Sequence, residues 1–590
     1  MPFLPITKEE LKGEEADFVM IMPEAYVDHP SFGHAIISRL INEYGYRIGL
    51  IPQPQTDDDY KKFGKPKIAF IISGGVVDSM VNNYTVAKIK RKTDCYSEGG
   101  KYGLRPDRAV TVYSKKLKSL FPDSAVIIGG IEASLRRMAH YDYWSDSVMP
   151  SILVDSGADL LMYGMGEKEW WDILERVDKG LPIKDIKDVE GTAFLSSYEN
   201  LPDRIKNGMQ NKEYIECPSF EEVKRDKKVF VKAFKIQNEN INYISGKGLY
   251  QRHGKVYVIQ NPPARPLDTD EMDKVYAMPY MRNAHPVYKE KIPAFDEIKF
   301  SITSHRGCFG NCSYCALSYH QGRSISSRSK NSIIKEAKSF LEDKDFKGYI
   351  HDIGGPTANF MNPSCEKQKT LGICKDKQCI GFKKCPNLKI DHTDFLEILR
   401  GVRSLEGIKK VFIRSGIRFD YIMYDKNEDF FDELIKYHIS GQLKVAPEHC
   451  SDNVLELMNK PPFKIYEDFC EKYKQKNEKF KMKQFLVPYL ISSHPGCTIS
   501  DAIKLTKYLK SINFMPEQVQ DFYPTPATKS TCMFYTGIDP DTGKEVYVPR
   551  SPDEKKLQRA LLQYRLKENL PLITPLLNKG GGKKNIKKKK

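Results

Sequence analysis

Three cysteines stand close together in the string Ser304-His-Arg-Gly-Cys308-Phe-Gly-Asn-Cys312-Ser-Tyr-Cys315. Thiolates are soft ligands that suit iron–sulfur clusters or zinc, and three on one short loop can each bind a separate iron of a single cubane. The fourth iron is then left for a ligand from outside the protein. A structural zinc site generally needs four closed ligands, which this loop lacks by itself. The spacing therefore predicts an iron–sulfur cluster on Cys308, Cys312 and Cys315.

A second group of cysteines lies in the segment 360–392 and consists of Cys365, Cys374, Cys379 and Cys385. The lysines, glycines and prolines of this segment make a poor hydrophobic core, so a bound metal could be what orders it. Zinc, an auxiliary iron–sulfur cluster and free thiols are the open alternatives. Asp391 and His392 close the segment, either as further ligands or as exposed polar turn residues. The other six cysteines are isolated and are expected in cores.

The first half of the chain must supply a scaffold. Apolar runs, several of them ending in glycine pairs, alternate with helix-length segments at 18–22, 47–51, 67–75, 125–130 and 159–164. This pattern is typical of a buried parallel sheet, so an α/β, Rossmann-like core is expected over about 15–175. Its candidate ligand loops follow strands, at 26–33, 73–78 and 129–137. Residues 190–295 are less regular and predict an elaboration and connector, which completes a first domain over 1–295.

A second strand–helix series begins near residue 296. Strands are expected at 298–303, 348–353, 409–414, 442–446, 483–490 and 517–523, with helices near 331–342, 394–404, 428–438, 452–478 and 499–510. Six such units predict a partial (β/α)6 barrel over 296–525. The segment 360–392 would be inserted at the carboxyl end of the second strand, where it can cover a substrate pocket. The string Ser551-Pro-Asp-Glu554 predicts a capping box that opens a short helical C-terminal extension within 526–590.

The cysteine loop resembles the signature of the radical S-adenosylmethionine (SAM) superfamily, C-x3-C-x2-C with an aromatic residue, here Tyr314, before the third cysteine. The loop also follows the first expected barrel strand, as in that superfamily. The resemblance implies that Cys308, Cys312 and Cys315 bind a [4Fe–4S] cluster. It further implies that the open iron chelates the amino and carboxylate groups of SAM, and that an electron from the cluster cleaves SAM to a 5′-deoxyadenosyl radical.

The same resemblance suggests SAM contacts at later strand ends. Gly354 and Gly355 stand where the superfamily has a GGE-type motif, although Pro356 replaces its glutamate. Ser415 and Arg418 follow the third strand, and Glu448 and His449 follow the fourth, where SAM ribose or carboxylate contacts occur in the superfamily. The competing interpretation is that these polar residues belong to an ordinary surface.

Over nearly its whole length the chain resembles the YgiQ-type family of radical SAM proteins. The strings that carry this resemblance are Gly129-Gly-Ile-Glu-Ala-Ser-Leu-Arg-Arg137, Gly354-Gly-Pro-Thr-Ala-Asn359, Val445-Ala-Pro-Glu-His449, Val519-Gln-Asp-Phe-Tyr-Pro524 and Tyr535-Thr-Gly537. The family resemblance implies a YgiQ-type N-terminal domain, a SAM barrel and a short extension. It implies an electron-donor protein of flavodoxin or ferredoxin type, but it supplies no substrate.

A Rossmann-like domain before such a barrel is similar to cobalamin-dependent members, whose first domain carries a D-x-H-x-x-G motif. In Asp28-His29-Pro-Ser-Phe-Gly33 the acid and the imidazole are adjacent, which does not match the motif. We therefore expect no cobalamin and interpret His29 as a turn residue before a helix rather than as a cobalt ligand. The pair Arg136-Arg137 lies near an expected helix start and faces either an anionic ligand or solvent.

The net charge of +16 suggests a nucleic-acid partner, but seven of these charges are lysines of the tail 579–590. This Gly/Lys-rich tail is expected to be disordered and is either a solvated appendage or an RNA-binding arm. The chain has no apolar run long enough to span a membrane and no visible signal peptide, which predicts a cytoplasmic protein without a membrane partner.

These features predict a radical SAM enzyme that acts on an unidentified substrate. One alternative is an RNA-modifying methyl- or methylthiotransferase, supported by the basic tail but weakened because no RNA-binding module is recognisable. The other is a metal-dependent nucleic-acid-binding protein whose cysteine sites are structural and which has no catalysis.

Overall fold

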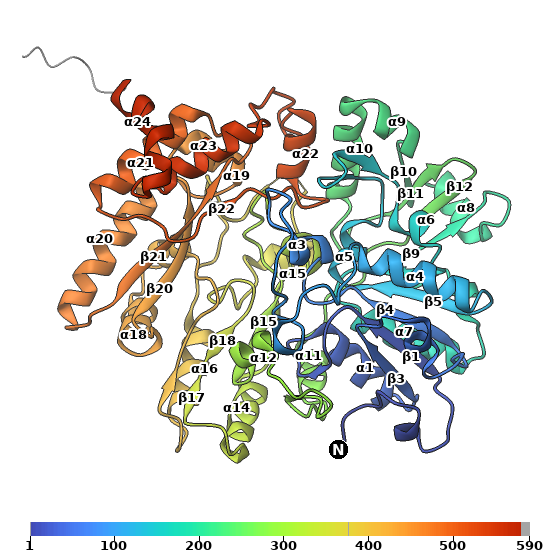
Figure 1. Ribbon diagram of the computed structural model, residues 1–590. Coiled ribbons are helices and arrows are strands. Elements are labelled where there is room, and N and C mark those ends of the chain that lie inside the picture. Colours follow the sequence, from blue (N-terminus) through green and yellow to red (C-terminus); the bar gives the residue numbers. More distant parts are fainter. Residues whose placement is uncertain (1, 376, 580–590) are drawn as a thin grey trace, which may run out of the picture.

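The computed structural model describes residues 2–375 and 377–579 (Figure 1). Its first half is built on a nine-stranded sheet with the strand order β10-β11-β12-β9-β8-β5-β4-β1-β3. Five of these strands run parallel to one another, as their apolar runs predict: β1 (Phe18–Met22), β3 (Ile48–Pro52), β4 (Ala69–Ser73), β5 (Ala125–Gly129) and β8 (Leu160–Met162). The predicted Rossmann-like arrangement is confirmed.

Helices cover both faces of this sheet because successive side chains of each strand point to opposite sides. Phe18 and Met20 of β1 pack with α1 (Gly33–Glu43) and α7 (Glu167–Asp178), whereas Val19 packs on the opposite face with α4 (Ala109–Leu120). The shorter helices of this region are α2 (Asp57–Lys61), α3 (Ser79–Asn83), α5 (Gly130–Leu135) and α6 (Ile152–Ser156). The two apolar layers fix the carboxyl strand ends at one edge.

The sheet extends further than predicted. The region 190–295 adds β9 (Thr192–Ser196), β10 (Tyr214–Cys217), β11 (Gly248–His253) and β12 (Val256–Gln260), beside α8 (Asp203–Gln210), α9 (Phe220–Arg225), α10 (Lys227–Glu239), α11 (Thr269–Tyr276) and α12 (Pro293–Ile298). A buried amide interrupts the apolar pattern of β11, since Gln251 accepts from the Ala139 amide at 2.8 Å and donates to the Pro218 carbonyl. Both of its polar groups are satisfied, so β11 is buried without an apolar run.

The second half places parallel strands side by side in chain order. β14 (Ser301–Thr303) pairs with β18 (Asp352–Gly354), β17 (Tyr349–Ile350) pairs with β19 (Lys410–Val411), and β20 (Gln442–Glu448), β21 (Phe485–Ser492) and β22 (Gln520–Asp521) form a third set. The intervening helices are α14 (Lys330–Ser339), α16 (Thr393–Arg403), α17 (Phe419–Tyr424), α18 (Asp429–Glu433), α19 (Asp452–Met458), α20 (Phe463–Lys479) and α21 (Ile499–Ser511). Every predicted barrel strand overlaps an observed one.

The C-terminal extension is helical, with α22 (Lys529–Thr536), α23 (Pro552–Leu562) and α24 (Leu570–Lys579). Ser551 caps α23 by accepting from the Glu554 amide at 3.1 Å, but the Glu554 carboxylate does not return to Ser551 and accepts instead from the Tyr547 hydroxyl. Only half of the predicted capping box is therefore present. The tail prediction falls almost entirely on residues 580–590, which lie outside the described residues.

One apolar cluster joins the two halves of the chain. Tyr141 and Tyr143 of the hairpin β6 (His140–Asp142)–β7 (Ser147–Met149) share a buried core with Phe534 of α22 and Leu561 of α23. Figure 1 shows α22 lying against α10 at this junction. In the part of the chain that the structure describes, we find no helix that combines the length and apolarity needed to cross a bilayer.

Candidate functional site

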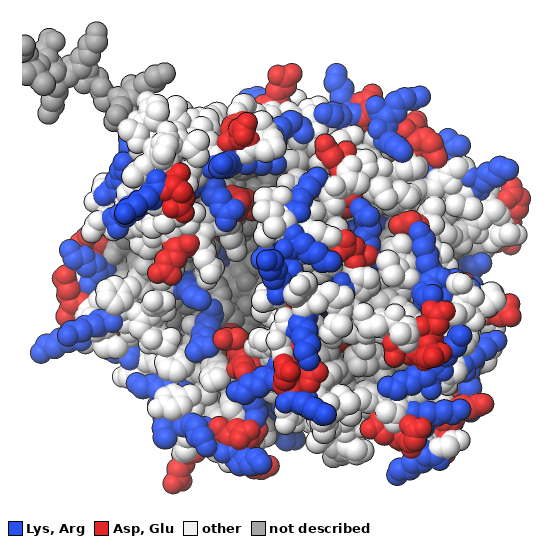
Figure 2. Space-filling model, in the orientation of Figure 1, with Lys and Arg blue, Asp and Glu red and all other residues white. Residues whose placement is uncertain are grey.

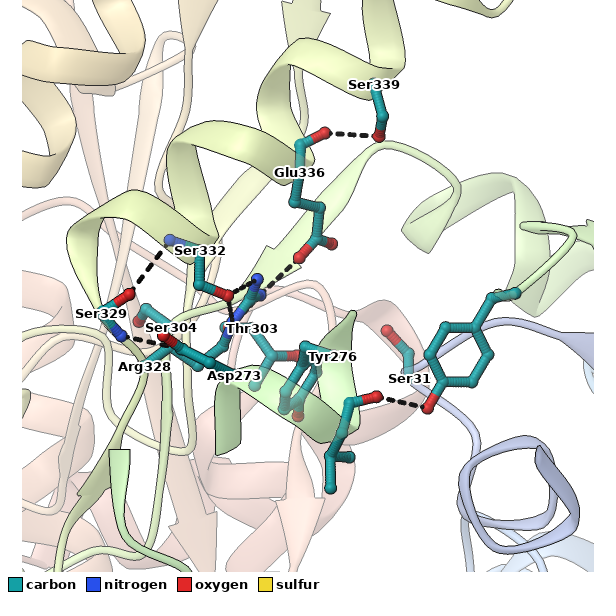
Figure 3. A network of polar contacts seen from close by, with 12 residues as sticks. Ser31, Asp273, Tyr276, Thr303, Ser304, Arg328, Ser329, Ser332, Glu336 and Ser339 are labelled. Atoms are coloured by element: carbon teal, nitrogen blue, oxygen red, sulfur yellow. Dashed lines mark hydrogen bonds and ion pairs between the residues drawn. The ribbon is translucent and has the colours of Figure 1, made fainter. Parts of the chain in front are cut away.

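The cysteine loop is closed at its base by a two-stranded clasp. β15 (His305–Arg306) and β16 (Ser326–Ser327) pair antiparallel and hold both ends of residues 307–325, which include the short helix α13 (Leu317–His320). Figure 3 shows the polar network behind the clasp, in which Arg328 contacts Glu336 and Ser332 of α14. The Arg328 guanidinium also donates to the Thr303 carbonyl at 3.0 Å and lies over the ring of Tyr276 on α11. The loop is thus tied to the first barrel strand and to the N-terminal half.

Two glycines allow the loop to pass close to its neighbours. Gly307 has φ +82°, a conformation that favours glycine, and a side chain there would collide with the Ser324 carbonyl. A Cβ on Gly310 would lie 2.8 Å from Arg418 Nη1 and 3.3 Å from Cys308 Sγ. The loop backbone at Gly310 therefore lies so close to Cys308 and Arg418 that a side chain would not fit between them.

The three thiols are brought together around this loop. Cys308 Sγ lies 3.3 Å from Thr357 Oγ1, and Arg418 Nη1 lies 3.7 Å from Cys312 Sγ. Burial raises the pKa of Cys315 to about 12, with the neighbouring Cys312 and Cys308 thiols adding to the effect, and burial also raises the pKa of Cys308. A metal that binds here must displace these thiol protons.

Arg418 and its partner form the charged part of the site. The buried guanidinium makes two parallel contacts with Asp420, at 2.8 Å from Nε and 2.6 Å from Nη2. It therefore offers Cys312 a cation that is already held in one orientation. Asn359 fixes the backbone beside it, because its Oδ1 accepts from the Arg418 amide at 2.9 Å.

Gly354, Gly355 and Ser415 meet at the ends of the second and third strands. A Cβ on Gly354 would lie 2.7 Å from Ser415 Oγ, and one on Gly355 would lie 2.6 Å from the His305 carbonyl. Ser415 contacts the carboxylate of Asp352 through both its hydroxyl and its amide, the latter at 3.1 Å. The glycine pair therefore faces the clasp on one side and Ser415 on the other.

Glu448 lies at the end of β20 and contacts the cysteine loop directly. Its Oε1 accepts from the Tyr314 hydroxyl at 2.7 Å, with Lys460 Nζ at 4.0 Å. Burial raises the pKa of Glu448, although the Lys460 cation opposes this. His449 is buried beside it and its Nδ1 accepts from the Ser451 amide, while burial lowers its pKa to about 4. Because Arg418, Glu448 and His449 are all buried, the interpretation of these residues as ordinary surface is wrong.

A large cavity of about 990 Å³ opens onto Cys312 and Cys315. Its walls come from α10, from the segment 375–386 without the undescribed residue 376, from α19 and from residues 527–547. Seven lysines line it: Lys235, Lys375, Lys377, Lys383, Lys384, Lys529 and Lys544. The space suits a small-molecule or larger ligand next to the cysteine loop. Figure 2 shows that on one face of the molecule lysines and arginines are mixed with acids around a hollow.

One cysteine of the second group, Cys379, packs against the same apolar cluster as Cys308 of the first. Cys379 Sγ lies 3.2 Å from Ser364 Oγ, Cys365 precedes α15 (Glu366–Leu371), and Cys385 lines the large cavity. Within the described residues, no group of three or more Cys, His, Asp or Glu side chains converges as a single metal ion requires. Zinc needs four ligands at about 2.1–2.3 Å from one point, so no zinc site is preformed around Cys374 or its neighbours. Ligands of a cubane bind different irons and need not converge.

The two residues that close the segment 360–392 have structural partners. His392 Nδ1 lies 2.6 Å from Asp425 Oδ2 and its Nε2 lies 3.2 Å from Asn359 Nδ2, while its ring stacks on Phe430. The prediction of an exposed turn residue is therefore wrong for His392, which is buried, and both of its ring nitrogens are engaged. Asp391 accepts from the Thr393 amide at 3.0 Å, in the turn that leads into α16.

The singled-out residues of the N-terminal domain are also buried. His29 Nδ1 accepts from the Ser31 amide at 3.1 Å, and its Nε2 lies 3.3 Å from an Arg282 nitrogen. Arg136 pairs with Asp78, and Arg137 lies between the rings of Tyr163 and Tyr319. Neither arginine faces solvent, so that alternative is wrong.

Comparison of the amino-acid sequence with known protein families identifies the family of this chain. Residues 3–301 match the family described as Radical SAM N-terminal, residues 302–509 match the Radical SAM superfamily, and residues 517–589 match a domain of unknown function, DUF3362. A UPF0313 protein of Clostridium botulinum (strain Okra / Type B1) is 54% identical, over 98% of this chain and 90% of that protein. This chain belongs to the UPF0313, or YgiQ-type, family of radical SAM proteins. The family prediction is confirmed.

A second UPF0313 relative, CPE1196 of Clostridium perfringens (strain 13 / Type A), is 51% identical over 98% of this chain and 87% of its own length. Solved structures are more distant. The radical SAM methyltransferase TsrM of Kitasatospora setae, with cobalamin and a [4Fe–4S] cluster bound, aligns with 88% of this UPF0313 chain and 76% of its own, at 12% identity and a TM-score of 0.48. The cobalamin-dependent enzyme OxsB with aqua-cobalamin bound covers 88% and 55%, at 12% identity and a TM-score of 0.44.

Sequence reasoning missed three polar residues of this UPF0313 site, namely Asp352, Asn359 and Asp420. Each of them contacts one of the predicted residues Ser415 and Arg418. Asp352 and Asp420 are single acids within otherwise apolar runs, in Tyr349-Ile-His-Asp352-Ile and Phe419-Asp420-Tyr-Ile. A buried acid in such a run needs a partner, and this signal could have found both.

Proposed function

We propose that this protein is a radical SAM enzyme that holds a [4Fe–4S] cluster on Cys308, Cys312 and Cys315. The observation that carries the proposal is the meeting of three partly buried thiols with the Arg418 guanidinium at a loop whose glycine Gly310 leaves no room for a side chain. The donor set fits the group, because three thiolates leave one iron open. When bound and reduced, the cluster would supply the electron for reductive cleavage of SAM to methionine and a 5′-deoxyadenosyl radical.

The residues of this chain would hold SAM and balance charge around it. The backbone of Gly354 and Gly355 and the side chain of Ser415 would contact SAM, because they meet at the strand ends beside the clasp. Arg418 would offset the negative charge of the thiolates, since its cation lies next to Cys312 and is held by Asp420. Glu448, held by its hydrogen bond with Tyr314, would supply a carboxylate beside the cysteine loop.

The cavity next to Cys312 and Cys315 is the proposed substrate chamber, and the second cysteine group forms part of its wall. The chain's contribution there is to exclude water and to position the substrate, since the hard chemistry belongs to the cofactor. The proposed electron donor is a small protein of flavodoxin or ferredoxin type.

Anaerobic reconstitution followed by dithionite and SAM tests the proposal. We expect iron and sulfide to bind and 5′-deoxyadenosine to form, and both to be lost in C308S, C312S and C315S. C217S, at a buried cysteine elsewhere, is the matched control and should retain both. A cluster that forms without any 5′-deoxyadenosine would contradict the proposed enzymatic function. A protein that binds only zinc would favour the alternative of a nucleic-acid-binding protein with structural cysteine sites.

The second cysteine group is tested by the same preparation. We propose it as a second metal site, with zinc or an auxiliary cluster as its occupant. The quadruple variant C365S/C374S/C379S/C385S would then bind less metal than the wild type, while 5′-deoxyadenosine formation continues. Equal metal contents in the two proteins would show that these four residues are free thiols.

A further inference from the structure

A second, smaller cavity of about 120 Å³ lies between the N-terminal sheet and the cysteine loop. Its walls come from 163–169 at the end of β8, from 241–243, from 263–267 and from 319–324 after the cysteines. It is separate from the proposed SAM contacts, because Gly354, Gly355, Ser415, Arg418 and Glu448 do not line it. Tyr319 and Ile241 line both this cavity and the larger one, so the two are neighbours.

Three arginines that line this cavity are nearly inaccessible to bulk solvent. Arg137, Arg306 and Arg323 are 3%, 5% and 4% exposed. Arginine keeps its charge in proteins, and a buried charge is unfavourable unless it is paired. Of these three arginines, only Arg306 has a carboxylate partner within 4.0 Å in the described part of the chain, which is Glu167 at 2.5 Å. The cavity therefore has more buried positive charge than its own acids match.

Two of these guanidinium groups also have nitrogens without a partner. Nη2 of Arg306 and Nε of Arg323 are buried and make no hydrogen bond within residues 2–375 and 377–579. The other nitrogens of Arg306 contact the Tyr276 hydroxyl and Glu167. Buried N–H groups are almost always satisfied, so these two indicate an acceptor from outside the chain.

The amino end of α7 adds further donors to the same cavity. Its capping residue Gly166 has no side chain that could accept from the first-turn amides, and residues 164–169 line the cavity. The positive end of a helix dipole favours an anion at this place. The two acids of this turn do not cancel the excess positive charge of the cavity. Glu167 is already paired with Arg306, and burial raises the pKa of Glu169 to about 8, so that its carboxyl is protonated at neutral pH.

We propose that this cavity binds a small anion that carries a phosphate or carboxylate group, held by Arg137 and Arg306 at the amino end of α7. Arg323 also contacts the second cysteine group, since it lies near Cys379 and Cys374. Thiolates there can balance its charge, and the proposal therefore rests on the other two arginines. Arg137 is suited to the role because Gln260 and the Ser134 carbonyl hold its guanidinium between two tyrosine rings.

Calorimetric titration of the full-length, anaerobically purified protein tests the proposal. The probes are inorganic phosphate and succinate, each at an ionic strength matched with potassium chloride, because salt screens non-specific attraction. We expect saturable binding of one of the two probes. Binding of inorganic phosphate would identify a phosphate site, and binding of succinate would identify a carboxylate site. R137M keeps an unbranched side chain between the tyrosines, and R306Q keeps a donor for Tyr276. Either variant should weaken binding by about tenfold or more.

R176M is the matched control, because Arg176 lies on the same helix α7 but pairs with Asp188 outside the cavity. Its affinity should equal that of the wild type. The proposal is overturned when neither probe binds saturably, or when R137M and R306Q bind as tightly as the wild type. A crystal structure of the wild type grown with the binding probe covers the case in which both variants fail to fold. Anion density against Arg137 and Arg306 supports the site, and its absence overturns it.

Discussion

At the scale of single residues, Arg418 connects the cysteines to the rest of the barrel. Its guanidinium is buried, paired with Asp420 and placed beside Cys312. Removing one member of a buried ion pair leaves the other charge without compensation, whereas removing both can be nearly neutral. The pair is therefore best examined with single and double variants.

We predict that R418Q lowers the free energy of unfolding by about 3–5 kcal/mol and lowers the iron content after reconstitution. The double variant R418Q/D420N should recover much of the stability but not the iron content, because only the charge imbalance is repaired. Denaturant unfolding and iron analysis measure the two effects. Stability losses that simply add in the double variant would contradict the expected coupling.

Glu169 gives a pH dependence of known sign. Burial raises its pKa in the folded protein to about 8, above the value of about 4.3 for an unfolded chain. Its contribution to stability is therefore complete below about pH 4.3 and is lost as the pH rises through 8. We predict that E169Q gains stability relative to the wild type between pH 5.5 and pH 8.5, on the order of a few kcal/mol. Parallel stability–pH curves for the two proteins in this range would contradict the shift.

At the scale of elements, the glycines of the cysteine loop set how closely it packs. A Cβ on Gly310 would meet Arg418 and Cys308, whereas one on Gly416 would meet nothing within 4 Å. We predict that G310A lowers cluster occupancy after reconstitution and that G416A leaves it unchanged, with both proteins folded. Iron and sulfide analysis next to circular dichroism provides the measurement. Full occupancy in G310A would show that the loop can move away from Arg418.

The elements themselves were largely predictable from the sequence, because apolar runs and their breaks are local signals. The strands β1, β3, β4, β5 and β8 and the predicted barrel strands were found this way. β9 to β12 were not, and in β11 the buried amide of Gln251 interrupts the apolar pattern. The pairing of Asp352 with Ser415 joins residues far apart in the chain, and no local pattern contains such information. The proposed anion site likewise depends on Arg137 and Arg306, which are far apart in the chain and line one cavity.

At the scale of the whole molecule, the apolar cluster between the halves makes them one cooperative unit. It combines the aromatic hairpin β6–β7 of the first half with helices of the C-terminal extension. Trp144 Nε1 also donates to the Tyr523 hydroxyl at 3.1 Å across this junction. Separating the halves would expose these side chains to water, which is unfavourable in proportion to the apolar area.

We predict that L561A destabilises the whole protein, by about 2–5 kcal/mol, because Leu561 is fully buried in the shared cluster. Calorimetry should show a single unfolding transition that moves to lower temperature. L572A, at an exposed leucine of α24, is the control and should change little. Two transitions, of which only one moves, would mean that the halves unfold independently.

The contact between Asn359 and His392 has a consequence for protein engineering. These residues mark the two ends of the segment that carries the second cysteine group, and their side chains lie 3.2 Å apart. A segment whose ends already touch can be exchanged for one of different length without altering the barrel that carries it. The segment can thus be exchanged as a unit. The wall of the proposed substrate chamber in one barrel could then be replaced by the corresponding segment of another barrel.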